Sequence, residues 1–92
     1  WLQAWFGAQC NGDWEHSEGV SISSLDNPGW RVQIHLAGTA LQGRAYSRSE
    51  VSHAEHDWCW TWVEHDVFHA ACGPLNLGEA IHTFRQWVQS VD

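Results

Sequence analysis

Apolar and polar residues alternate in two neighbouring segments, residues 19–25 and 30–36. In the first, Val20 and Ile22 alternate with serines, and in the second, apolar residues at even positions alternate with Arg31, Gln33 and His35. A period of two is typical of strands with one buried face. The sequence DNPG at 26–29 lies between them, and its Pro and Gly suit the central positions of a type II turn. We therefore predict a β-hairpin here.

A second alternating pattern starts at residue 58, where tryptophans 58, 60 and 62 alternate with smaller side chains. His and Asp tolerate positive φ, so residues 64–66 predict a turn and residues 67–71 a returning strand. A further strand is predicted at 45–51, although 47–55 is polar enough to form a loop instead. The total is about five strands.

Both ends of the chain show helical spacing. Apolar residues at 1, 2, 5 and 6 predict a helix over 1–10, which stops at Asn11-Gly12. Asn76 is a suitable N-cap for a second helix, with Glu79 as its capping-box partner. The apolar stripe of that helix consists of Leu77, Ile81, Phe84, Val88 and Val91, widened by Trp87.

This order of elements predicts an α+β fold in one domain spanning residues 1–92. Short connections favour an antiparallel β-meander of about five strands, with the N- and C-terminal helices packed on one face. We expect Trp58, Trp60 and Trp62 to face the helices, whereas a solvent-facing series would make a sugar-binding platform. The opposite face would then carry Ser21, Ser23, Arg31, Gln33, His35, Cys59, Thr61 and His69.

The chain is acidic, with eleven Asp and Glu, four Arg, no Lys and a formal net charge of −7. Such a surface repels phosphate backbones, which argues against nucleic-acid binding, and it attracts basic protein partners. Protonation of all seven histidines would bring the charge to about zero. Binding that depends on charge should therefore weaken below about pH 6.

The three cysteines, Cys10, Cys59 and Cys72, lack C-x-x-C spacing, which predicts reduced thiols rather than a disulfide framework. No apolar run has the length of a membrane span or a signal-peptide core. We expect a soluble, cytoplasmic protein that has no cofactor and does not bind membranes.

Histidine spacing raises the question of a metal site, since His53 and His56, and His65 and His69, have ligand-like separations. The spacing is ordinary for ligands on a helix, but these residues fall in predicted strands and loops. His65 and His69 could share one face of a strand only if the turn ended before His65. A small metal- or ligand-binding module is therefore the alternative interpretation. The sequence has no G-x-S-x-G elbow, P-loop or H-E-x-x-H motif, so we do not expect an enzyme.

Because antiparallel strands alternate in direction, the acidic segment 13–18 and the turn at 64–66 should lie at the same end of the sheet. Five carboxylates would gather there. Acidic residues in loops are often merely solvated, and the alternative is that this end grips a basic surface.

Four segments together resemble the immunity protein 53 family of bacterial polymorphic toxin systems: WLQAW at 1–5, CNGDWEH at 10–16, LDNPGW at 25–30 and GPLNL at 73–77. The resemblance runs from Trp1 to about Trp87 and is weakest over 44–56. The family more often has Asp where this chain has Asn11, and Gly where it has Cys72. Both departures lie in a turn or a strand end.

The resemblance implies a cytoplasmic antidote that binds a cognate bacterial toxin domain, nucleases being one class of such toxins, and neutralises it by occlusion. It supplies no catalytic residues. The partner would be a basic toxin domain, and the chain itself a monomer or weak homodimer. As partner contacts we mark the charged and aromatic motif members and the acidic turn: Asp13, Trp14, Glu15, His16, Glu18, Asp26, Glu64 and Asp66.

Overall fold

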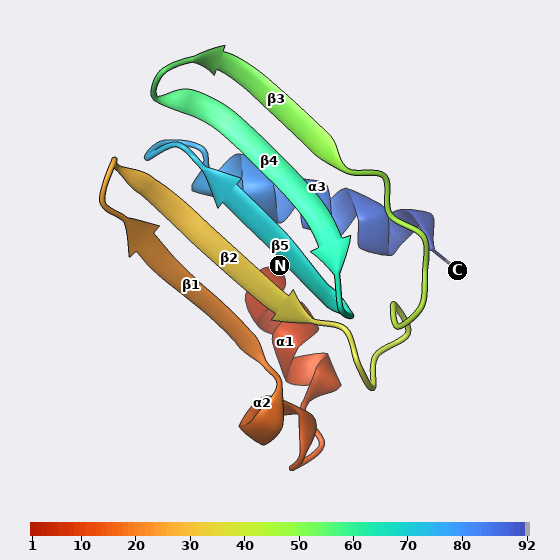
Figure 1. Ribbon diagram of the computed structural model, residues 1–92. Coiled ribbons are helices and arrows are strands. Elements are labelled where there is room, and N and C mark those ends of the chain that lie inside the picture. Colours follow the sequence, from red (N-terminus) through yellow and green to blue (C-terminus); the bar gives the residue numbers. More distant parts are fainter. Residues whose placement is uncertain (92) are drawn as a thin grey trace.

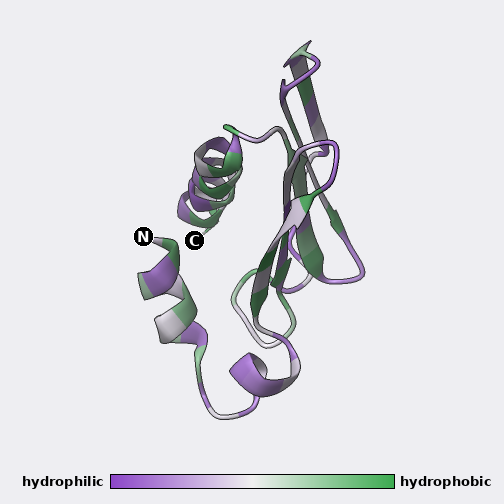
Figure 2. Ribbon diagram, turned by 90° about the vertical axis from the view of Figure 1, so that its left-hand side faces the viewer, coloured by the Kyte–Doolittle hydropathy of each residue, from purple (hydrophilic) through white to green (hydrophobic). Residues whose placement is uncertain are grey.

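The computed structural model describes residues 1–91. Its elements are α1 (Leu2–Gln9), α2 (Trp14–Ser17), β1 (Val20–Leu25), β2 (Gly29–His35), β3 (Ser49–Ala54), β4 (Asp57–Glu64), β5 (Val67–Cys72) and α3 (Leu77–Ser90). The strands form one five-stranded antiparallel sheet (Figure 1). Both α1 and α3 lie on the same side of it (Figure 2). The predicted α+β fold is confirmed.

The strand order is β1-β2-β5-β4-β3, so the predicted meander order was wrong. β5 pairs with both β2 and β4, and β3 lies at the far edge (Figure 1). The residues of β3 and β5 explain why β5 lies inside the sheet and β3 at its edge, the reverse of the order in a meander. Phe68, Ala70 and Cys72 of β5 are all 0% exposed, whereas β3 reads SEVSHA and suits an edge, where one side of the strand meets water.

The connection between β2 and β3, residues 36–48, is long enough to carry the chain to that edge. Leu36 and Leu41 of this segment are buried in the core. The ring of Tyr46 packs edge-on against Phe68 and Trp87. Because residues 45–48 are used in this packing, β3 starts at Ser49 and not at residue 45 as predicted.

The first hairpin forms as predicted, but its turn is not a type II turn, which requires positive φ at glycine. Gly29 has no positive φ and is the first residue of β2, paired with Leu25. A Cβ at Gly29 would collide with the carbonyl oxygen of Cys72 on β5. Glycine is required here for close approach of two strands. The second predicted turn is confirmed, with φ of 54° at His65 and 59° at Asp66.

The core lies between the sheet and the two long helices. Phe84 of α3 is 0% exposed and contacts Trp5 of α1 and Phe68 of β5, with ring centroids 5.0 Å apart in both pairs. The buried face of α3 is Ala80, Phe84 and Trp87, with Leu77 and Val88 beside it. Asn76 precedes α3 without the predicted cap: its amide donates to Asp57 and Glu79.

The predicted orientation of β4 was wrong. Cys59 and Thr61 face the core, and Trp58, Trp60 and Trp62 face away from the helices, where Trp60 is 37% exposed. Phe68, Phe84, Trp87 and Tyr46 already fill the space under α3, so β4 contributes only small side chains there. The buried Thr61 hydroxyl bonds the Tyr46 hydroxyl at 2.6 Å, which satisfies a polar group in the core.

Candidate partner-binding surface

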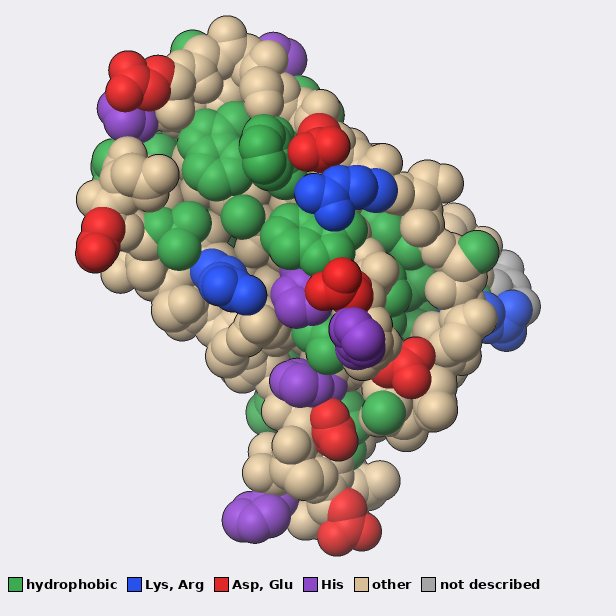
Figure 3. Space-filling view, viewed as in Figure 1, with side chains coloured by type: hydrophobic (Ala, Val, Ile, Leu, Met, Phe, Trp, Pro, Cys, Tyr) green, Lys and Arg blue, Asp and Glu red, His purple; other side chains and the backbone are tan. Residues whose placement is uncertain are grey.

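The face of the sheet opposite the helices is uncovered (Figure 2). On this open face, hydrophobic side chains gather over β4 and β5, with charged side chains around them (Figure 3). Trp58 and Trp60 pack edge to face, with ring centroids 5.6 Å apart, and the Trp60 indole donates to the Ser52 hydroxyl at 3.0 Å. We call Trp58, Trp60 and Trp62 the tryptophan face. Exposed tryptophans are typical of binding surfaces rather than of solvated sheets.

The tryptophan face is hollowed. A depression of about 690 Å³ opens over it. Its lining combines the three indoles with side chains from the neighbouring strands and turns: Asn27, Arg48, Ser52, Ala54, Glu55, Trp58, Trp60, Trp62 and Ala71. Ala71 of β5 provides part of the floor, since it pairs with Trp60 and carries only a methyl group.

Trp62 lies between a cation and an imidazole. The Arg48 guanidinium carbon lies 5.0 Å from the Trp62 ring centroid, and the His69 ring stacks on the indole with centroids 5.2 Å apart. Trp62 pairs with His69 across β4 and β5, and Arg48 comes from the opposite, β3 side. Burial, followed by the positive charge of Arg31, lowers the pKa of His69. Arg48, Trp62 and His69 thus form one row, joined by a cation–π contact and an aromatic stack.

The five acidic residues of segment 13–18 and of the turn at 64–66 lie at the same end of the sheet, as predicted. Val20 of β1 pairs with Ile34, and His35 and Glu64 both pair with Val67. The turn at 64–66 therefore lies beside the α2–β1 connection. We call Asp13, Glu15, Glu18, Glu64 and Asp66 the acidic end; all five are exposed.

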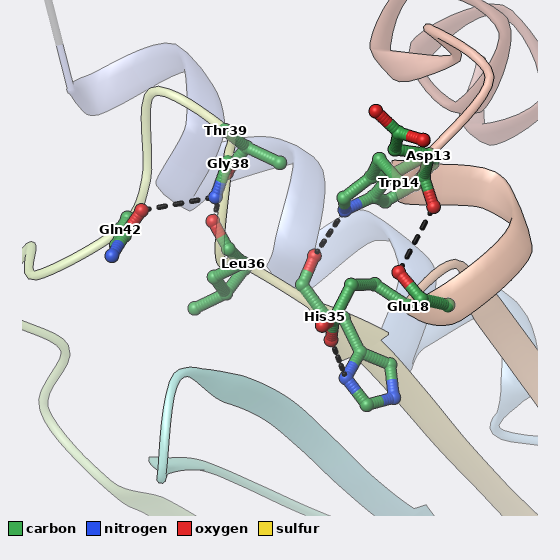
Figure 4. Close-up of polar contacts among 9 residues, drawn as sticks. Asp13, Trp14, Glu18, His35, Leu36, Gly38, Thr39 and Gln42 are labelled. Carbon is green, nitrogen blue, oxygen red and sulfur yellow. Dashed lines mark hydrogen bonds and ion pairs between the residues drawn. The ribbon is translucent and has the colours of Figure 1, made fainter.

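Two contacts hold α2 against the sheet at this end (Figure 4). The Glu18 carboxylate lies 2.9 Å from His35 Nδ1, and the Trp14 indole donates to the His35 carbonyl at 3.3 Å. These contacts fix the position of the acidic segment relative to the open face, because His35 belongs to β2.

The other predicted contacts in segment 11–18 have different environments. The Glu15 carboxylate accepts from the backbone N–H groups of Asn11 and Gly12 at 2.8 and 2.7 Å. Hydrogen bonds from its own backbone N–H and from that of Asn11 lower the pKa of Glu15. His16 is exposed, but Trp14 is only 4% exposed and packs edge to face on Trp5. The Trp14 side chain is thus a core residue with little surface to offer a partner.

Asp26 lies at the opposite end, in the turn between β1 and β2. Its neighbour Asn27 lines the hollow, as does Glu55 in the turn between β3 and β4. Asp26 was among the contacts predicted from the sequence, whereas those predictions omitted Arg48, Glu55, Trp58, Trp60 and Trp62. The alternation at 58–62 was the signal for the tryptophans, but it was assigned to the wrong face.

The histidines and cysteines that were considered as possible metal ligands are dispersed in the structure. His65 lies in a turn and His69 on the open face, whereas Cys59 and Cys72 face the core. Within residues 1–91, no group of three or more His, Cys, Asp or Glu side chains could hold a metal ion. Over the same range, no helix has the length and apolar character needed to cross a bilayer.

Comparison with protein families gives a match to the model of immunity protein 53 over residues 1–89. The chain belongs to the immunity protein 53 family. This match includes every strand and all but the last residue of α3, so the acidic end and the tryptophan face both lie within the family domain. Neither the curated proteins nor the solved structures give a match to this immunity protein.

Proposed function

We propose that this immunity protein binds a bacterial toxin domain directly and neutralises it by occlusion, without catalysis. The family match over residues 1–89 is the observation that carries the proposal. A sheet face with the exposed indole of Trp60, the half-buried indoles of Trp58 and Trp62, and a cluster of carboxylates at one end supports it. Such a surface has the apolar centre and polar surroundings of a protein interface.

The acidic end is the proposed contact for a basic surface of the toxin. With a net charge of −7, the chain would attract a basic partner over several ångströms and accelerate its association. The contacts proposed there are Asp13, Glu15, His16, Glu18, Glu64 and Asp66. A nuclease with a basic active-site cleft fits this charge, and it is the toxin class that we propose.

Co-expression tests the function. The chain is produced in a bacterial host together with the toxic C-terminal domain encoded beside its gene, and survival and co-purification are scored. We expect rescue and a stable complex. Continued killing without a complex would contradict direct neutralisation by this chain.

Charge-neutralising variants test the acidic end. Glu64→Gln combined with Glu18→Gln should slow association with the toxin several-fold at low salt, and the difference should shrink at high salt because exposed charges are screened. Glu79→Gln on α3 is the matched control for Glu64→Gln alone: each removes one carboxylate, and the amide oxygen at position 79 can still accept from Asn76. Equal association rates for the double variant and wild type would contradict the charge-based contact.

A further inference from the structure

We infer that the hollow on the tryptophan face receives an arginine or lysine side chain of the toxin, an inference that rests on the proposed function. Three indoles line one depression of about 690 Å³, on a sheet face that no helix within residues 1–91 covers. The electron-rich faces of tryptophan bind cations better than those of any other side chain. The hollow therefore fits a basic side chain better than a purely aliphatic one.

Both signs of charge surround the hollow: the exposed Arg31 of β2 pairs with the lining residue Ala71, and carboxylates lie at the turns. Glu55 lines the hollow and its side chain is 89% exposed, and Asp26 is adjacent to the lining residue Asn27. Arg48, the cation in the lining, already lies over Trp62 and within 3.4 Å of a Glu50 carboxylate oxygen. The Glu55 carboxylate lies 4.0 Å from His56 Nε2, and its 89% exposure leaves it accessible to a cation brought by a partner.

The chain itself shows the geometry in which such a cation binds. Arg48 lies over Trp62 at 5.0 Å from the ring centroid, and Trp58 and Trp60 stand next to Trp62 on the same side of β4. A toxin side chain seated on Trp58 and Trp60 would repeat this contact one step along the strand. Long basic side chains also bury their methylene stems against apolar surfaces, which the hollow provides.

The hollow lies midway along the strands, so that a toxin contact with it and with the acidic end would run along the sheet. The acidic end lies at one end of the strands, and Asp26 and Glu55 lie at the other, with the tryptophan face between them. A basic toxin surface that spans the open face would contact carboxylates at both ends and insert one side chain in the middle. Buried aromatic contacts of this kind dominate binding energy, and the surrounding charges contribute less.

The test is a binding series on the purified wild-type complex. Trp60→Ala should weaken the toxin complex at least about 30-fold, the usual effect of truncating a dominant interface residue. Trp60→Phe should lose less affinity than Trp60→Leu, because phenylalanine retains an aromatic face and leucine does not. The Glu55→Gln variant should weaken binding by a smaller factor.

Trp1→Ala is the matched control. Trp1 is also an exposed tryptophan, at 40%, and has Arg85 over its ring at 5.7 Å, but it packs on α3 at the helix side of the molecule. The Trp1→Ala variant should bind the toxin with an affinity within about twofold of wild type. Circular dichroism and thermal unfolding of each variant separate loss of binding from loss of fold.

The cation is identified by a second series, in which exposed Arg and Lys residues of the toxin are changed singly to Met. One such change should lose about as much affinity as Trp60→Ala, and combining the two should cost little more than either alone.

Unchanged affinity of Trp60→Ala in an intact wild-type complex would overturn the inference and leave the proposed function standing. The inference would also be overturned if the loss of affinity from Trp60→Ala added fully to the loss from every toxin variant. A homodimer of the wild-type chain that Trp60→Ala abolishes would overturn it too, because the hollow would then bind a second copy of this chain. If the wild-type chain forms no complex at all, the proposed function fails and this inference fails with it.

Discussion

The imidazole of His69 lies flat against the indole of Trp62, with the ring planes at 7° to each other and the centroids 5.2 Å apart. The two residues are cross-strand neighbours on β5 and β4, so the contact links the two strands on the open face. His69 Nδ1 is buried and has no hydrogen-bond partner within residues 1–91. A proton placed there would gain no acceptor.

This contact predicts that stability falls on mild acidification. Burial is the main reason why the pKa of His69 lies below its ordinary value of 6.5 in the folded chain, with Arg31 and His35 lowering it further and Glu64 opposing them. As pH falls below about 6.5, the unfolded chain takes up this proton before the folded chain does, so the free energy of unfolding decreases. Below the folded pKa the effect levels off.

Urea unfolding at pH 7.5 and pH 5.0 measures the effect. His69→Phe retains an aromatic ring against Trp62 and cannot titrate, so it should lose less stability between the two pH values than wild type does. His82→Gln, an exposed position on α3, serves as the control. An identical pH dependence for His69→Phe and wild type would rule out His69 as the source.

The buried hydroxyl pair predicts strong coupling between Thr61 and Tyr46. Thr61→Val leaves the Tyr46 hydroxyl without its 2.6 Å partner and should cost about 1–3 kcal/mol. The double variant with Tyr46→Phe should cost less than the sum of the single variants, because no buried hydroxyl remains. Thr83→Val, whose hydroxyl bonds a helix carbonyl at the surface, should change stability by less than about 0.5 kcal/mol. Additivity in the cycle would contradict the pairing.

The close approach of β2 and β5 predicts that Gly29→Ala is destabilising by about 1–3 kcal/mol, because a Cβ would force the Cys72 carbonyl to move. Gly78→Ala tests the specificity of this effect. Gly78 is in the first turn of α3, where a Cβ would meet no atom within 4 Å, and alanine should stabilise the helix by about 0.5–1 kcal/mol. Chemical denaturation should show a lower free energy of unfolding for Gly29→Ala and a higher one for Gly78→Ala. Equal decreases for the two variants would show that the collision is not the cause.

The cysteines should differ in reactivity. The pKa of every thiol is raised: burial raises that of Cys59 to about 12 and also raises that of Cys72, and desolvation and the Glu15 carboxylate raise that of Cys10. Accessibility separates them, because Cys10 is exposed and the other two are buried. Since thiolates are the reactive form, a short treatment of the folded chain with iodoacetamide at pH 8 should modify Cys10 alone. Three modifications should appear in denaturant, and mass spectrometry counts them. Rapid modification of Cys59 in the folded chain would contradict the buried orientation of that side chain on β4.

The spacing of apolar residues along the sequence alone determined where most strands and helices of this protein lie. Alternation at 19–25, 30–36 and 58–63 located three strands, the turn at 64–66 located a returning strand at 67–71, and the helical spacing at both ends located α1 and α3. The turn at 64–66 and the clustering of the acidic segment with it also followed from local chemistry and from strand direction. These features depend on residues that are close in sequence, or on the alternating direction of antiparallel strands. Both can be predicted from a single sequence.

The tertiary structure decided which face and which neighbour each strand received. The period of β4 is the same whether Trp58, Trp60 and Trp62 point inward or outward; the volume already filled by Phe68, Phe84 and Trp87 turned them outward and created the hollow. In the same way, β5 took the centre of the sheet because its inward residues Phe68, Ala70 and Cys72 can be fully buried under the helices. Both outcomes depend on competition for one core among residues distant in sequence, and a local pattern does not record that competition.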